Sequence, residues 1–336
     1  MRVKQYGTQE AAKFFAALFL NRQAQWPAFA LIVGASIWGV IWYPLRQLAA
    51  LGLSGALAVA LIGLAACCFA LIAFRQPLLE SWRIILTQAA PKGSSYWLLP
   101  ILGVTAGMSN VSIIWGMIHG EVIRVLLLFY LSPVWTAFFA HWLLRERVTL
   151  VDMAAALCAL IGTALILWSP ELGFPIPTVL AEWAGLFAGI GFALQNVLAL
   201  KISRTLPVQT PQLRTTIVFA GDMVVGFLIC GFEWMRGSLM SAPLTQPGFA
   251  FILLIGLGIL LAANSLLIQY GLSRMPANRA ALLMLFEIVV TAISTWLLAG
   301  ETLGWREVSG GGAIVAASLL SSWFQQQERV AHQAVP

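Results

Sequence analysis

The sequence predicts an all-α polytopic membrane protein with ten transmembrane helices, arranged as two inverted five-helix repeats. Its composition is 60% hydrophobic and only 10% charged, whereas a soluble domain carries about 25% charged residues. Apolar stretches of about 20 residues, long enough to span a bilayer core as a helix, recur from Trp26 to Phe324. The third observation is a match of the sequence with itself at one fixed offset.

Ten helices follow from the apolar stretches, because irregular backbone cannot face lipid and is confined to loops. Proline and glycine mark the gaps: SPELGFPIPT separates the fifth and sixth helices, and SAPLTQPG separates the seventh and eighth. A longer loop is expected at 75–95. The expected helices are 26–50, 53–74, 96–118, 122–143, 148–168, 179–201, 213–235, 247–271, 277–299 and 304–324.

The chain divides accordingly into four parts. Residues 1–25 form a cytoplasmic N-terminal segment, which is either an interfacial helix or a basic tail. Residues 26–170 and 179–324 form the two five-helix repeats, and residues 325–336 form a cytoplasmic tail.

Lysine and arginine are distributed unevenly between the two sides of the membrane. If the N-terminus is cytoplasmic, 15 of the 19 basic residues fall on that side, as the positive-inside rule requires. The outer side keeps Arg46, Arg124, Arg236 and Arg306. We therefore expect a protein of the cell inner membrane with both termini cytoplasmic. The net charge of +6 then has a membrane explanation and indicates no nucleic-acid partner.

The internal match appears when the sequence is shifted by 155 residues without a gap. A chance overlap of leucines is the alternative, but the matched glycine and charged positions argue for a duplication. Each half holds five helices, an odd number, so the second half must be inserted upside down. Such inverted repeats are the architecture of alternating-access transporters, with the substrate site near the bilayer midplane. Matched pairs include Gly34 with Gly189, Arg46 with Lys201, Arg124 with Arg279, and Glu146 with Glu301.

Three segments carry a resemblance to a known family. The stretches IWGVIWYPLR, LSPVWTAFFAHWLLRERVTL and RAALLMLFEIVVTAISTWLLAGETL resemble the EamA-like, ten-helix exporters of the drug/metabolite transporter superfamily. Ile288 replaces a proline of the family pattern, so the ninth helix is expected to lack a kink. The resemblance covers roughly residues 27–324 and implies the fold and export of small organic molecules, without naming a substrate. The residues that carry it are Trp38, Gly39, Arg46, Pro133, Glu146, Glu287 and Glu301.

Two acidic residues lie deep in the expected membrane. Glu287 is ten residues from the cytoplasmic end of its helix, roughly 15 Å deep, where a charge costs about 2.5–3.5 kcal/mol on insertion scales. Asp222 lies at a similar depth, and the repeat mates of these acids are Ser132 and Cys67. If the two acids share a cavity, they could bind a cation or carry protons. The alternative is that each only hydrogen-bonds a neighbouring helix.

Other residues are candidates for the pathway or its gates. Arg124 and Arg279 each begin the fourth helix of a half and could form gates, or could extend towards lipid head groups. Glu146 and Glu301 end their helices and could cap the helix that follows. Candidate pathway residues, which could instead join or pack helices, are Ser36, Trp38, Asn110, Trp115, Gln195, Asn196 and Asn264.

Motifs for ATP binding, metal binding and covalent catalysis do not occur in the sequence. We therefore expect no enzyme activity, cofactor or metal. The function that fits is a secondary transporter that exports metabolites, amino acids or amphipathic drugs by alternating access, with proton coupling as an option. The alternatives are an uncoupled facilitator or channel, or a membrane subunit that does not transport. The expected partners are the substrate and the bilayer, and a homodimer is left open.

Overall fold

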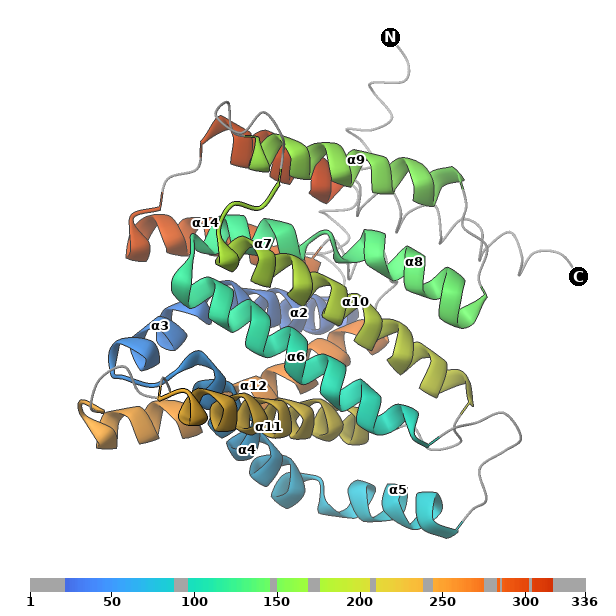
Figure 1. Cartoon of the computed structure of the whole chain (residues 1–336). Helices are drawn as coiled ribbons and strands as arrows, with labels where there is room; N and C mark the ends of the chain where they lie inside the picture. Colours follow the sequence, from blue (N-terminus) through green and yellow to red (C-terminus); the bar gives the residue numbers. More distant parts are fainter. Residues whose placement is uncertain are drawn as a thin grey trace, which may run out of the picture.

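The computed structural model describes residues 22–87, 96–145, 150–168, 176–205, 210–237, 244–274, 283–284, 286–301 and 304–316. Arg279 and Glu146 lie outside these ranges, as do the chain before Arg22 and the tail after residue 316. Throughout the described ranges the regular secondary structure is helical (Figure 1). A described helix overlaps each of the expected ones.

The helices of the first half are α2 (Arg22–Val40), α3 (Trp42–Ala50), α4 (Gly55–Ala73), α5 (Arg75–Thr87), α6 (Leu98–His119), α7 (Val122–Phe129), α8 (Ser132–Leu144) and α9 (Leu150–Leu167). The second half contains α10 (Leu180–Thr205), α11 (Pro211–Met235), α12 (Pro247–Arg274) and α14 (Phe286–Ala299). A further helix covers residues 305–316.

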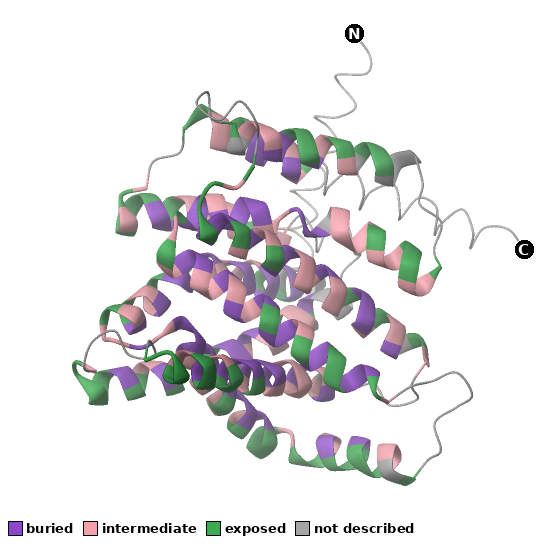
Figure 2. Ribbon diagram, in the orientation of Figure 1, coloured by how far each residue is buried: buried purple, intermediate pink, exposed green. Residues whose placement is uncertain are grey.

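Seven segments of the described chain are long and apolar enough to cross a bilayer, and they include α4, α6, α10, α11 and α12. The other two join helices in pairs, α2 with α3 and α7 with α8. Shorter apolar stretches lie in α9 and α14. Individual helices carry both buried and exposed residues (Figure 2), and the exposed ones include many large apolar side chains. The chain is therefore a multi-pass membrane protein.

Two helices of the first half are interrupted, and proline accounts for both interruptions. The expected first helix breaks at Ile41, three residues before Pro44, and the expected fourth helix breaks at Tyr130 and Leu131, just before Pro133. Proline has no N–H group for the bond to the preceding turn. In the second half α10 is continuous, whereas α14 begins at Phe286, two residues before Ile288; the position that corresponds to the break at Tyr130 lies outside the described residues, so the expectation that the ninth helix lacks a kink stays a prediction.

The segment expected to be a loop at 75–95 contains a helix, α5, so this expectation was wrong for residues 75–87. One face of α5 packs on the start of α11, where Leu78 and Leu213 are buried together. Ser81 Oγ lies 3.2 Å from Thr210 Oγ1 in a hydrogen bond. The other face exposes Leu79 and Trp82, a pattern typical of a helix at a membrane surface.

The two halves pack through repeat-related contacts. Helix α6 packs on α11, and its repeat mate α12 packs on α4, the mate of α11. A Cβ on Gly103 would lie 3.0 Å from the oxygen of Ile217, and a Cβ on its mate Gly258 would lie 2.9 Å from the oxygen of Ile62, the mate of Ile217. Likewise, α2 packs on α12 and α14, while α10 packs on α6, α7 and α8.

Repeat-related helices that touch each other run in opposite directions. Along α4 and α11, Gly63 lies against Phe219 and Met223, whereas Ala60 lies against Gly226. The same holds where Cys158 of α9 meets Ala313, its own mate in the helix 305–316, at 3.5 Å. An axis that relates α4 to α11 must therefore cross them near Leu64 and Phe219.

The contact between α6 and α11 predicts the effect of enlarging one glycine. A Cβ at Gly221 would overlap the backbone of Gly103, whereas Gly231 on the same helix has open space around it. We expect Gly221→Leu to destabilise the protein by about 1–3 kcal/mol, because backbone cannot shift as a side chain can. Gly231→Leu is the matched control, and its unfolding temperature should equal or exceed that of the native protein. Thermal unfolding in detergent, followed by tryptophan fluorescence, measures both; equal unfolding temperatures would contradict the packing.

Candidate functional site

Asp222 of α11 lies where α4, α6 and α11 meet. Its side chain is buried, and both carboxylate oxygens accept hydrogen bonds from Asn110 Nδ2 of α6, at 2.9 and 3.1 Å. A Cβ on Gly63 of α4 would lie 3.1 Å from the Asp222 Cβ. The structure thus brings together two candidate residues from opposite halves.

Glycine spacing explains why this pair can form. Gly103, Gly107 and Asn110 follow one another at helical spacing on α6, and both glycines lie against Gly221, the neighbour of Asp222. Small residues let two helices approach closely inside a membrane. At that separation the short Asn110 side chain reaches the carboxylate of the facing helix.

Asp222 also lies near the middle of the apolar span Gln212–Met235. It is three residues from Phe219, near which the axis between the halves crosses α11, so it lies about 4.5 Å along the helix from that axis. Two halves inserted in opposite orientations place such an axis in the plane of the membrane, near its centre. A charge at this depth is costly unless it is paired or neutralised.

Glu287 lies in a different part of the molecule, in the first turn of α14. Its backbone oxygen lies against Gly39 of α2. Its carboxyl faces the hydroxyl of Tyr130, at the junction of α7 and α8, although the two form no hydrogen bond of standard geometry. The two acids therefore have different partners on different helices, which does not support one shared cavity.

Tyr130 was not singled out by sequence reasoning. Its position just before the break at Pro133 was the available signal, because an interrupted helix at membrane depth lies against protein rather than lipid. Nearby helices hold further unused hydrogen-bonding capacity. The Tyr130 hydroxyl, Trp135 Nε1 and Gln195 Oε1 are buried without a hydrogen-bond partner, on α10 and on the α7–α8 segment that packs against it.

The other candidate residues have varied surroundings. Asn264 donates to the oxygen of Gly34 at 3.3 Å, and its repeat mate Ser109 donates to the oxygen of Ala188 at 2.8 Å. Each bond joins the third helix of one half to the first helix of the other. Ser36 donates to Ile32 of its own helix. Trp38 packs against a buried cluster formed mainly by α3, α4 and α12. Trp115 stacks on His119, and Asn196 is exposed.

Two charged residues have partners from the opposite half. Arg124 forms an ion pair with Glu182, at the start of α10, at 3.1 Å. Glu301 accepts hydrogen bonds from the backbone N–H groups of Val122 and Ile123 at 3.2 and 3.4 Å. Glu301 was expected to cap the helix that follows it, but the helix that it caps in the structure is α7. Sequence reasoning could not identify this cap because α7 is remote in the chain.

Buried acids between packed, oppositely running halves of a multi-pass bundle are features of a membrane transporter. A model of the EamA-like transporter family matches residues 25–168 and 179–323, most of the chain. The protein belongs to this family, which is part of the drug/metabolite transporter superfamily, as the sequence motifs indicated.

Individual proteins are also similar to the chain. The "Uncharacterized transporter YcxC" of Bacillus subtilis (strain 168) is 22% identical over 185 residues, which are 54% of this chain and 59% of that protein. The match thus spans less than two thirds of that relative. A solved structure described as "Crystal structure of protein" is similar with a TM-score of 0.55 and 14% sequence identity. The match covers 89% of this chain and 96% of the chain in that structure. This likeness is one of fold alone.

The contact between Asn110 and Asp222 predicts energetic coupling. Asn110→Ala and Asp222→Ala should each lower the free energy of unfolding. The double variant should lose less than the sum of the two single losses, because either change alone already breaks the hydrogen bond between the two side chains. We expect a coupling of about 0.5–3 kcal/mol, measured by unfolding in detergent. Ser109→Ala is the control, since it breaks a bond to α10 that does not involve Asp222; its effect should add to that of Asp222→Ala. If the destabilisations caused by Asn110→Ala and Asp222→Ala simply added, the contact between the two side chains would be ruled out.

Proposed function

We propose that this protein is a secondary transporter that exports small organic molecules, such as amino acids, other metabolites or amphipathic drugs, from the cytoplasm. Ten transmembrane helices in two inverted repeats, over 26–170 and 179–324, would alternate access to a central site. The observation that carries the proposal is the packing of two oppositely running halves around the buried acid Asp222, which Asn110 of the other half contacts. The positive-inside distribution supports cytoplasmic termini in the cell inner membrane. Export, rather than import, rests on the family resemblance.

The acids supply the proposed chemistry. Asp222 has a neutral amide as its partner and forms no ion pair within the described residues. Glu287 faces a neutral hydroxyl. A carboxylate at membrane depth needs either a proton or a cation to balance its charge. Each acid can therefore bind a proton or a positively charged group of the substrate, and exchange between these two ligands would couple export to proton entry.

The buried donors and acceptors on α10 and on the α7–α8 segment suit the binding of a polar organic molecule. Tyr130, Trp135 and Gln195 offer two donors and an acceptor, and the two aromatic rings also offer faces to a cation. A buried polar atom without a partner is energetically unfavourable. A substrate that satisfies these atoms would gain that energy on binding, which favours amphipathic molecules with an amine or amide group.

Flux into proteoliposomes tests the proposed coupling. Proteoliposomes that contain the native protein are supplied with a panel of amino acids, amines and amphipathic drugs, with and without an imposed proton gradient. We expect the gradient to drive accumulation against the substrate gradient, and expect Glu287→Gln or Asp222→Asn to abolish that component, since an amide cannot carry the proton. Glu80→Gln, at an exposed acid of α5, is the control and should transport normally.

Two outcomes would contradict this proposal in different ways. Flux that ignores both the gradient and the substitutions at Glu287 and Asp222 would indicate an uncoupled facilitator. No flux for any member of the panel, in protein that is folded and correctly reconstituted, would indicate a membrane subunit that does not transport.

A further inference from the structure

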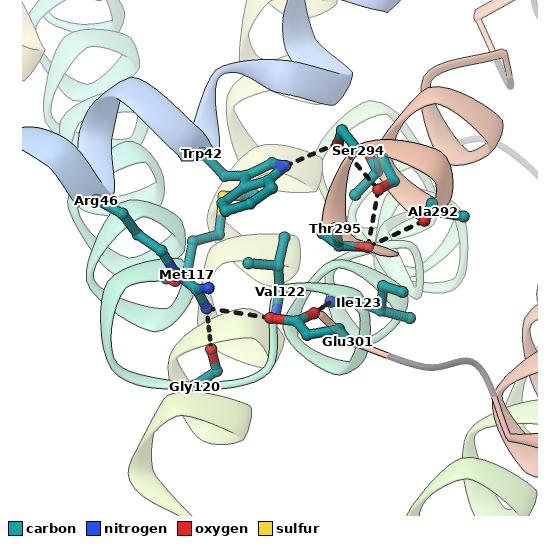
Figure 3. Close-up of polar contacts among 11 residues, drawn as sticks. Trp42, Arg46, Met117, Gly120, Val122, Ile123, Ala292, Ser294, Thr295 and Glu301 are labelled. Atoms are coloured by element: carbon teal, nitrogen blue, oxygen red, sulfur yellow. Dashed lines mark hydrogen bonds and ion pairs between the residues drawn. The ribbon is translucent and has the colours of Figure 1, made fainter. Parts of the chain in front are cut away.

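A charged network joins the two halves at one end of the bundle, where α3, the α6–α7 corner and the end of α14 meet (Figure 3). Arg46 forms an ion pair with Glu301 at 3.2 Å. The Arg46 guanidinium also donates to the oxygens of Met117 at 2.9 Å and Gly120 at 2.6 Å, and lies over the ring of Trp42 at 5.1 Å. By the positive-inside distribution this end is the outer one.

The network is built on two helix ends. The last carbonyl groups of α6 and the first N–H groups of α7 have no partners within their helices, and helix dipoles make the first negative and the second positive. Arg46 satisfies the carbonyl groups of α6, while Glu301 satisfies the N–H groups of α7. Glu121, the residue at the N-cap of α7, makes no side-chain capping bond. A carboxylate from the opposite half thus takes the place of the local cap.

Arg46 and both helix ends belong to the first half, whereas Glu301 belongs to the second. Further bonds across the same boundary lie near by: Trp42 Nε1 donates to Ser294 Oγ at 3.0 Å, and Ser294 Oγ donates to the oxygen of Gly39 at 2.9 Å. Two ion pairs, Arg46–Glu301 and Arg124–Glu182, join one half to the other at this end.

The ion pair is partly accessible to water, with side-chain exposures of 27% for Arg46 and 15% for Glu301. Water can therefore replace the partners as the halves separate, so the contact can break and re-form. A fully buried pair could not do this without a large desolvation cost. The arrangement suits a closure that opens in each cycle.

We propose that Arg46 and Glu301 are positioning residues that hold the outer end of the transporter closed, with Glu301 seated on the start of α7 as the closing contact. This inference rests on the proposed transport function. Opening requires the Glu301 carboxylate to leave the N–H groups of Val122 and Ile123, and the end of α14 to move away from α3 and the α6–α7 corner.

Distances between spin labels test this closure without any transport assay. In a background lacking the four native cysteines, labels are placed at Gln47 and Leu298, exposed residues of opposite halves at this end. We expect Glu301→Gln to shift the distance distribution to longer values, because the amide loses the charge that binds both Arg46 and the helix end. Glu307→Gln, at a nearby acid outside the network, is the control and should leave the distribution as in the native protein.

A charge exchange separates capping from a simple ion pair. In Arg46→Glu with Glu301→Arg the opposite charges remain, but each side chain then faces a helix end of its own sign. We expect this double variant to give the longer distances of Glu301→Gln. Restoration of the native distances would overturn the capping mechanism. If Glu301→Gln fails to fold, Arg46→Lys replaces it, since one ammonium cannot reproduce the donor geometry of the guanidinium and should also lengthen the distances.

The two proposals fail in distinguishable ways. Unchanged distances in Glu301→Gln, or in Arg46→Lys where that variant stands in for it, together with normal substrate flux in the native protein, would overturn the closure and leave the transport function standing. Longer distances with no flux for any substrate would support the closure as a contact between the halves and overturn the transport function.

Discussion

The close approach of α6 to α11 is the contact on which the rest of the structure depends. Helices in a membrane gain no hydrophobic free energy by leaving lipid for one another, so they associate through backbone contact, packing and hydrogen bonds. Gly103 and Gly107 face Gly221 backbone to backbone, which places Asn110 within reach of Asp222. A bulkier side chain at any of these glycines would separate the helices and leave Asp222 without its amide partner.

Duplication supplies the frame, and the differences between repeat mates supply the chemistry. The contact of Gly103 with Ile217 recurs as that of Gly258 with Ile62, so the two halves hold each other in the same way twice. Where mates differ, one half carries an acid and the other does not: Asp222 corresponds to Cys67 and Glu287 to Ser132. In the proposed function a symmetric frame would alternate between two similar packings, and acids that are present in one half only would give the two states different affinities for protons or cations.

The sequence predicts the features that are encoded locally. Hydropathy locates the helices, and proline explains the breaks near Ile41 and Tyr130. Helix α5 was missed because it is short and amphipathic, so a search for apolar stretches does not detect it. Asn110 and Asp222 were each singled out, but their pairing depends on how two helices rotate against each other. The cap that Glu301 provides for α7 depends likewise on a contact between residues remote in the chain, and no local pattern encodes it.

The two ends of the bundle join the halves by different forces. At one end α5 meets the start of α11 through the apolar pair Leu78 and Leu213 and one neutral hydrogen bond. At the end where α3 and α14 meet, the links include the ion pair of Arg46 with Glu301, which is partly exposed to water. Separating apolar surfaces exposes them to water at a cost proportional to their area, whereas separated ions regain hydration that offsets most of their attraction. The contact between Arg46 and Glu301 is therefore the more readily reversible of the two.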